Sequence, residues 1–242
     1  MIKLIKKVVY ELSRPMLVKN DFKDYDDYWE ERGFHAPSLC RAKIISKYIE
    51  PGSSVLDIGC GDGTIMEYLE KNNSPREVVG IDISSRAVSY IKGRGMNAYQ
   101  VDVMSENFPT FLFGRKFDYI IITEVLEHIQ DPEKVILSIR EHVERNVFIS
   151  IPNSGFILHR IRLLFGKFPL VAIKKHVKEH IRFWTLQDFV FWSGYYGYVV
   201  DSVVVSDGSS IKLLAFLQKL FPSLFAQQIL FKISKKIKTN VF

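Results

Sequence analysis

Residues 55–69 read VLDIGCGDGTIMEYL, and this stretch decides the fold. A short apolar run ending in Asp57 and Ile58 is followed by Gly59, Gly61 and Gly63 at alternate positions, and then by the start of an amphipathic pattern. Glycine is needed where a backbone turns sharply, or where a ligand must touch the backbone with no side chain between them. The stretch therefore predicts a strand, a ligand-binding glycine loop and a helix.

From residue 51 onward, short β-branched runs alternate with helical patterns. Strands are predicted at 55–58, 77–82, 97–102, 117–123 and 146–152, and helices at 63–71, 85–92 and 131–142. Farther along, a helix is predicted at 185–192, a strand at 198–205, a helix at 211–220 and a strand at 227–234, where a basic amphipathic helix is the alternative. Strands joined by crossover helices form a parallel sheet with helices on both faces. The prediction is a doubly wound α/β domain over residues 51–242.

The first 50 residues are predicted to be a helical segment and lid, with apolar side chains at helical spacing within 2–9 and a second helix at 41–49. Between these helices lies an aromatic and acidic stretch with a stop at Gly33. Three of its aromatic side chains are candidates to close over a bound ligand, with a place in the core as the alternative: Tyr25, Tyr28 and Trp29.

A basic insertion at 153–184 interrupts the domain after the fifth predicted strand. Its apolar residues at helical spacing are Ile157, Ile161, Leu164 and Phe165. In an open α/β sheet the carboxyl ends of the strands form the ligand crevice, so an insertion here can roof the site and select the substrate. A helical decoration of the surface is the alternative.

Composition narrows the class of protein. Hydrophobic residues make up 47% and charged residues 25%, which is typical of a packed globular chain. The net charge of +6 comes largely from the two ends, and no basic ribbon with interleaved aromatics predicts a nucleic acid partner. Cys40 and Cys60 lie far apart and suggest neither a disulfide framework nor a zinc site. With no secretory signal and no long charge-free apolar stretch, a cytoplasmic location is predicted.

Acidic residues stand at the ends of three predicted strands. Asp57 can face an ammonium group beside the glycine loop, and Asp82 can accept both hydroxyls of a ribose. Asp102 can bind an adenine amino group, with Ile83 and Val103 sandwiching the ring; an ordinary strand-ending aspartate is the alternative. The aspartates around the loop would repel the pyrophosphate of a dinucleotide, so the pattern favours a sulfonium cofactor.

These elements, in order over residues 51–152, resemble the class I S-adenosylmethionine-dependent methyltransferases. EVLEHIQDP, FISIPN, KEHIRFWTLQDF and the ending LFPSLFAQQILFKISKK resemble the MetW-like methyltransferases of the type 11 group. The resemblance implies a Rossmann-like seven-stranded sheet, mostly parallel with the last strand antiparallel, and S-adenosylmethionine as cofactor. The residues implied to bind it are Asp57, Gly59, Cys60, Gly61, Gly63, Asp82, Ile83, Asp102, Val103 and Glu124.

Glu124, Glu127 and His128 are spaced so that an α-helix starting after the fourth strand would place all three on one face. In one interpretation the two glutamates stabilise the N-terminus of that helix through its dipole, and His128 is a packing or helix-capping residue. In a second, His128 or His180 is the catalytic group that orients or deprotonates the methyl acceptor. In a third, the trio and His180 bind a divalent ion, as in metal-dependent O-methyltransferases with an ExxEH pattern, which this stretch resembles. The second interpretation is the prediction, with no metal.

The predicted function is O-methylation of a small polar or anionic acceptor, such as a cell-surface polysaccharide sugar or its precursor. An anionic acceptor is favoured by the basic residues around His180, for which a solvated face is the alternative: Lys174, Lys175, Lys178 and Arg182. One rival function, implied by the MetW resemblance, is a non-catalytic or regulatory partner of an acyltransferase in methionine biosynthesis. Another is a peripheral membrane enzyme, based on MIKLIKKVV at the start and LLAFLQKLF near the end.

Overall fold

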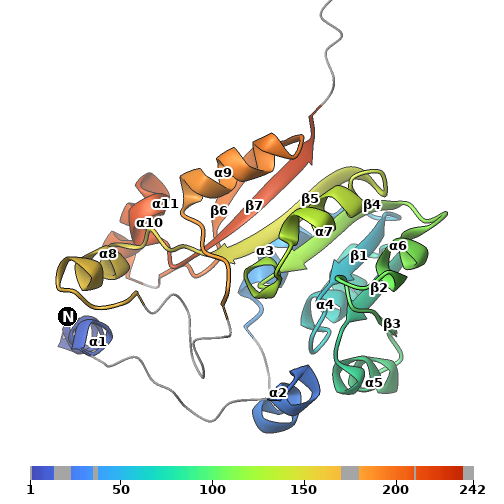
Figure 1. Ribbon diagram of the computed structural model, residues 1–242, viewed down its shortest axis with the longest axis horizontal. Helices are drawn as coiled ribbons and strands as arrows, with labels where there is room; N and C mark the ends of the chain where they lie inside the picture. The colour runs from blue at the N-terminus through green and yellow to red at the C-terminus, as the bar shows by residue number, and fades with distance from the viewer. Residues whose placement is uncertain (1, 14–22, 35–37, 170–179, 210, 237–242) are drawn as a thin grey trace, which may run out of the picture.

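A seven-stranded sheet forms the centre of the computed structural model, which describes residues 2–13, 23–34, 38–169, 180–209 and 211–236 (Figure 1). The strands are β1 (Ser54–Ile58), β2 (Glu77–Asp82), β3 (Asn97–Gln100), β4 (Phe117–Thr123), β5 (Val143–Pro152), β6 (Tyr198–Val205) and β7 (Gln228–Lys235). Their order in the sheet is β3-β2-β1-β4-β5-β7-β6. Only β7 runs antiparallel to its neighbours. The doubly wound sheet with a reversed last strand is therefore confirmed.

Helices cover both faces of the sheet. They are α1 (Ile2–Ser13), α2 (Tyr25–Arg32), α3 (Cys40–Ser46), α4 (Thr64–Asn73), α5 (Ser85–Gly93), α6 (Asn107–Leu112), α7 (Pro132–Ile139), α8 (Ile157–Leu164), α9 (Leu186–Tyr195), α10 (Lys212–Leu220) and α11 (Pro222–Phe225). The short helices α6 and α11 were not predicted. No helix that the structure describes has the length and apolarity needed to cross a bilayer.

The predicted α-helix over Glu124–His128 is wrong. The chain leaves β4 with Glu124 in the left-handed region, at φ 57°, and Val125 at φ −128°. Such backbone angles cannot continue into an α-helix. Only one 3-10 turn, η1 (Leu126–His128), follows. A non-glycine residue held at positive φ is strained, and strain of this kind is concentrated at functional sites.

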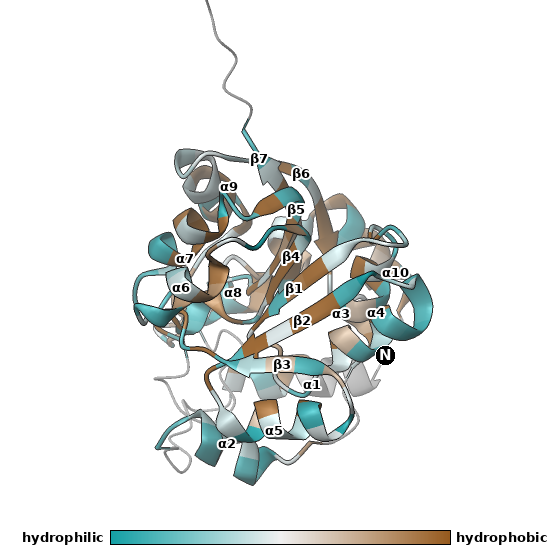
Figure 2. Cartoon of the chain, turned by 90° about the vertical axis from the view of Figure 1, so that its right-hand side faces the viewer, coloured by the Kyte–Doolittle hydropathy of each residue, from teal (hydrophilic) through white to brown (hydrophobic). Residues whose placement is uncertain are grey.

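Two buried clusters pack on opposite faces of the sheet, because successive side chains of a strand point to opposite sides. In β1, Leu56 belongs to the cluster beneath α7 and α9, while Val55 belongs to the cluster beneath α3, α4 and α5. The central strands are strongly hydrophobic (Figure 2). Ala42 and Ile45 of α3 are fully buried in the second cluster, so the end of the first 50 residues shares the core of the α/β domain.

Candidate functional site

The glycine loop between β1 and α4 requires its glycines for their backbone conformation. Left-handed φ angles of 70°, 54° and 72° occur at Gly59, Gly61 and Gly63. A Cβ atom at Gly61 would also lie 2.9 Å from Cζ2 of Trp29. The backbone amides of Gly59 and Cys60 both donate to the Ile81 carbonyl, which fixes the loop against the end of β2. The Cys60 thiol is buried, so this residue presents only its backbone to a ligand.

Two buried carboxylates flank the loop. Asp57 is 2% exposed, and its Oδ1 atom accepts no hydrogen bond from any described residue. Burial raises the pKa of Asp57 to about 8, with smaller contributions from the nearby carboxylates of Asp82 and Asp62. Asp82 accepts hydrogen bonds from the amides of Gly61 and Ser84, at 2.9 Å each. A buried carboxylate with an oxygen atom that lacks a hydrogen-bond partner among the described residues fits a cationic ligand group such as an ammonium.

Helix α2 is held over this loop by Asp26. Its carboxylate accepts hydrogen bonds from Ser84 Oγ at 2.5 Å, Ser85 Oγ at 2.7 Å and the Arg86 amide at 3.1 Å. The two serine hydrogen bonds lower the pKa of Asp26. The buried Trp29 ring covers the loop, as the contact with Gly61 shows. Helix α2 therefore closes one side of the site.

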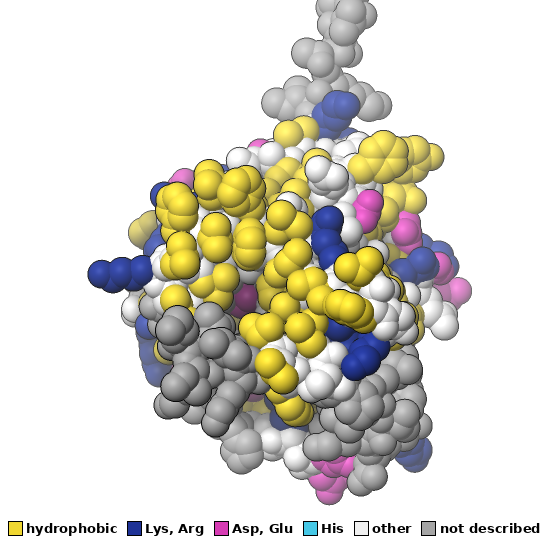
Figure 3. Space-filling model, turned by 90° about the vertical axis from the view of Figure 1, so that its left-hand side faces the viewer, with side chains coloured by type: hydrophobic (Ala, Val, Ile, Leu, Met, Phe, Trp, Pro, Cys, Tyr) yellow, Lys and Arg dark blue, Asp and Glu magenta, His cyan; other side chains and the backbone are white. Residues whose placement is uncertain are grey.

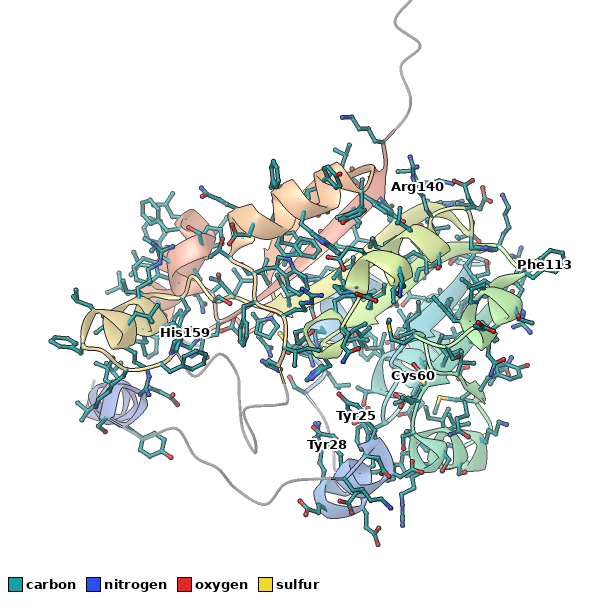
Figure 4. The ribbon with its side chains drawn as sticks, viewed as in Figure 1. Tyr25, Tyr28, Cys60, Phe113, Arg140 and His159 are labelled. Carbon is teal, nitrogen blue, oxygen red and sulfur yellow. The ribbon has the colours of Figure 1, made fainter. Side chains whose placement is uncertain are left out.

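A cavity of about 480 Å³ lies between α2 and the carboxyl ends of the strands. Its lining residues are Lys23, Asp24, Tyr25, Asp26, Ile83, Gln100 and His128. Tyr25 and Tyr28 project from α2 toward the sheet (Figure 4), and Tyr25 faces the cavity. Ile83 is 45% exposed and lines it as well. The lining thus includes Ile83, predicted for cofactor binding, and His128, predicted for catalysis.

Breaking the attachment of α2 should weaken ligand binding. Asp26→Ala removes three hydrogen bonds that hold α2 in place. A hydrogen bond contributes about 0.5–1.5 kcal/mol to stability, and more when the acceptor is charged. We expect S-adenosylhomocysteine affinity, measured by isothermal titration calorimetry, to fall by about tenfold. Asp27→Ala is the matched control on the same helix, because the Asp27 carboxylate accepts only from the Lys23 amide among the described residues. Equal losses in both variants would contradict a specific role for Asp26.

Asp102 and Val103 follow β3 and lie half-buried. Asp102 Oδ1 accepts a hydrogen bond from the Met104 amide at 2.8 Å, which forms a tight turn. Val103 packs against the cluster beneath α7 and α9. Neither residue lines the cavity described above. Their predicted contacts with adenine therefore stay predictions.

The Glu124 carboxylate is bound by groups from three separate elements. It accepts hydrogen bonds from Ser150 Oγ of β5 at 2.8 Å and from Gln228 Nε2 of β7 at 2.6 Å. Arg41 Nη1 of α3 lies 3.8 Å from it and donates to Gln228 Oε1 at 3.0 Å. The sequence did not point to Arg41 or Gln228, since neither belongs to a recognisable motif. This network holds the strained residue at the end of β4.

Glu127, His128 and His180 come together although 52 residues separate the histidines. One potential ligand atom from each residue lies within 4.8 Å of the others. The two imidazole centroids are 4.8 Å apart, and His128 Nε2 is 3.9 Å from Glu127 Oε1. The amides of Ile181 and Arg182 both donate to the Glu127 carbonyl, at 2.9 and 3.1 Å. The end of the insertion is thus fixed beside η1, as an insertion roofing the site requires.

The Glu127 side chain is 1% exposed, and neither carboxylate oxygen has a hydrogen-bond partner among the described residues. Burial, followed by the charge of Glu124, raises its pKa well above the usual range. One carboxylate and two imidazoles are also donors that bind divalent transition metals, and a cation would supply the missing partner of Glu127.

Comparison with known proteins identifies the family of this chain. A sequence profile of the family described as "Methionine biosynthesis protein MetW" matches residues 41–233. The ubiquinone biosynthesis O-methyltransferase of Histophilus somni (strain 2336) is 27% identical over 181 residues, covering 69% of this chain and 75% of that protein.

Solved structures share the fold. A SAM-dependent methyltransferase from Archaeoglobus fulgidus superposes with a TM-score of 0.60 at 18% identity, covering 88% of this chain and 100% of that one. The magnesium protoporphyrin IX methyltransferase from Synechocystis PCC 6803, solved with bound S-adenosylhomocysteine, gives a TM-score of 0.52 at 16% identity, covering 96% and 94% of the two chains. The chain therefore belongs to the MetW family and has the fold of the class I S-adenosylmethionine-dependent methyltransferases.

Proposed function

We propose that this chain transfers a methyl group from S-adenosylmethionine to a hydroxyl oxygen of a small acceptor. The observation that carries the proposal is the position of His128, which lines the same cavity as Ile83 and Asp26. The Histophilus somni relative is named as an O-methyltransferase, which supports an oxygen acceptor. A cell-surface sugar stays a prediction, because no described contact selects it.

In this proposal, some residues bind the cofactor and others transfer the proton of the acceptor. When bound, S-adenosylmethionine supplies a methyl group on a positively charged sulfur atom. Asp57 pairs with its ammonium group, while α2 orients the ligand and keeps water out. The acceptor hydroxyl passes its proton to an imidazole nitrogen of His128 as the oxygen–carbon bond forms and the sulfur–carbon bond breaks. His180, next to His128, positions that imidazole.

A cation-assisted mechanism is a second candidate, favoured by the buried and unpartnered carboxyl group of Glu127 beside two imidazoles. A divalent ion bound there would lower the pKa of the acceptor hydroxyl and stabilise the resulting alkoxide. The two mechanisms assign different states to Glu127. It is a neutral acid if His128 acts alone, and a carboxylate ligand if a cation is bound.

Glu127→Gln separates the two mechanisms. Glutamine reproduces the size of a neutral carboxylic acid, so His128 acting alone predicts near-normal turnover that EDTA does not change. A cation ligand predicts a large loss, about a hundredfold or more, and a similar loss when the wild-type enzyme is treated with EDTA and restored by Mg²⁺ or Mn²⁺. The measurement is methyl transfer to a panel of hydroxylated acceptors, with S-adenosylhomocysteine affinity as a check on folding.

The family description also leaves a non-catalytic role to be tested. A regulatory partner of an acyltransferase would bind S-adenosylhomocysteine without methylating any acceptor, and His128→Ala would leave its function intact. Turnover with any acceptor, abolished by that substitution, would exclude this alternative.

A further inference from the structure

Helix α8 buries polar side chains while apolar ones at its end are exposed. The buried residues of this helix are His159 and Arg162. Leu163 and Leu164, in its last turn, are 57% and 80% exposed, and Phe165, just beyond the helix, is 72% exposed. Exposed apolar side chains on a helix whose polar side chains are buried are the reverse of the usual arrangement. The reversal indicates that the outer face of α8 contacts something other than water.

The buried side of α8 is tied into the protein by Arg162. Its guanidinium donates to the carbonyls of Glu11 and Leu12, at the end of α1, and to the carbonyl of Phe168. These contacts satisfy the last carbonyls of α1 and bring α1 against α8. Arg162 thus fixes the orientation of α8, so the exposure of Leu164 and Phe165 is built into the fold.

Helix α10 shows the same reversal. Its buried residue is Gln218, whose side chain accepts from the Ser209 amide at 2.9 Å and donates to the Phe225 carbonyl at 3.2 Å. Leu213 and Phe216 are 69% and 59% exposed. Two helices from separate parts of the sequence therefore expose their apolar sides.

Both helices lie at one end of the molecule. Asn153, at the start of the insertion, donates from its amide nitrogen to the carbonyls of Ser223 and Ala226, which connects the root of α8 to α11 just after α10. Figure 1 shows α8, α10 and α11 grouped at the same end, and Figure 3 shows hydrophobic side chains gathered on that side with basic ones among them. We call the outer surface of α8, Phe165, Phe168 and α10 the apolar face.

The charge of the apolar face indicates the kind of surface that it contacts. Residues 153–169 and 208–236 contain no aspartate or glutamate. Exposed basic residues stand on both helices or directly beside them: Arg160, Lys167, Lys212 and Lys219. A second copy of the chain would bring these positive charges against each other, which is unfavourable. Apolar side chains surrounded by lysine and arginine match an anionic lipid surface. The apolar side chains contact the acyl chains there, and the lysine and arginine side chains contact the phosphates.

We propose that the apolar face docks on an anionic lipid bilayer. Leu164, Phe165, Leu213 and Phe216 enter the headgroup region, while the basic residues around them contact lipid phosphates. The stretch LLAFLQKLF already suggested membrane contact as one rival function, and the structure adds α8 and the direction in which both helices face.

Vesicle flotation tests the proposal on the full chain. We expect the protein to float with phosphatidylcholine vesicles that contain phosphatidylglycerol and to remain in the bottom fraction with phosphatidylcholine alone. Leu164→Glu combined with Phe165→Glu should lower partitioning into the anionic vesicles by about tenfold or more, because both side chains are already exposed and their loss removes apolar burial in the bilayer. Lys212→Glu combined with Lys219→Glu should also reduce flotation.

The matched control is Phe113→Glu. Phe113 is 86% exposed and lies at the opposite end of the molecule (Figure 4), so this variant should float like the wild type. Failure of the wild type to float with anionic vesicles would overturn the proposal, and so would equal losses in the control and the α8 variant. Self-association in sedimentation experiments that is lost in the α8 variant, with no flotation, would instead assign the apolar face to a second copy.

Discussion

Asp57→Asn is expected to lower the affinity for S-adenosylhomocysteine by about ten- to a hundredfold, because a hydrogen bond to a charged group contributes about 1.5–3 kcal/mol. The wild-type carboxylate is buried beside the glycine loop, and its Oδ1 atom has no hydrogen-bond partner among the described residues. In the proposed function, the ligand's ammonium group supplies that partner. Asparagine keeps the shape of the side chain but offers no charge, so isothermal titration calorimetry should register the loss as weaker binding.

The same substitution should change how binding and stability depend on pH. The pKa of Asp57 is about 8 in the folded protein, against an ordinary value of 3.8. An ammonium ligand binds the ionised form, so wild-type affinity should rise with pH and level off near pH 8. The stabilising contribution of a carboxyl group with a raised pKa is complete below its ordinary pKa and is lost as pH rises through the folded value. Ligand-free Asp57→Asn should therefore unfold at a higher temperature than the wild type above pH 8.

Asp118→Asn is the matched control for these measurements. Asp118 lies near the amino end of β4, at the opposite end of the strands from the cavity, where its carboxylate accepts from the amide and hydroxyl of Ser54. This variant should keep the wild-type affinity and its pH dependence. An Asp57→Asn protein that binds as tightly as the wild type, or whose affinity keeps the same pH profile, would show that Asp57 does not face the ammonium group.

The fold was predictable because each strand carries its own signal. The apolar alternation at 198–205 and 227–234 placed the last two strands within one residue of β6 and β7. The glycine loop was predictable for a related reason, because three glycines at alternate positions mark three left-handed residues. Such features depend on residues that are neighbours in sequence, so local physics determines them.

Features that depend on distant residues were not predictable. The spacing of Glu124, Glu127 and His128 suits an α-helix, but Ser150, Gln228 and Arg41 hold Glu124 in a conformation that interrupts one. These partners come from β5, β7 and α3.

The insertion shows a second limit. Its apolar residues do repeat at helical spacing, as predicted, yet periodicity does not state which side of a helix faces the core. That orientation was decided by Arg162 and the carbonyls at the end of α1.

His128→Ala is expected to reduce kcat by about a hundredfold to ten-thousandfold, the usual contribution of a general acid or base. Loss of a cation ligand would produce a decrease at least as large. Affinity for S-adenosylhomocysteine should change much less than kcat, because the contacts assigned to the cofactor come mainly from the glycine loop and Ile83. The measurement is steady-state methylation of the best acceptor found, with cofactor affinity determined on the same preparation.

His142→Ala provides the matched control for His128. His142 precedes the amino end of β5, at the opposite end of the strands from the cavity, and its Nδ1 atom is 2.8 Å from the Arg115 carbonyl. Normal turnover in this variant would show that the loss in His128→Ala is not a general effect of removing an imidazole. Full turnover in both His128→Ala and His180→Ala would remove the proton-transfer mechanism. The role of the cavity would then be limited to alignment of the two reactants, which by itself supplies about 7–11 kcal/mol of barrier reduction.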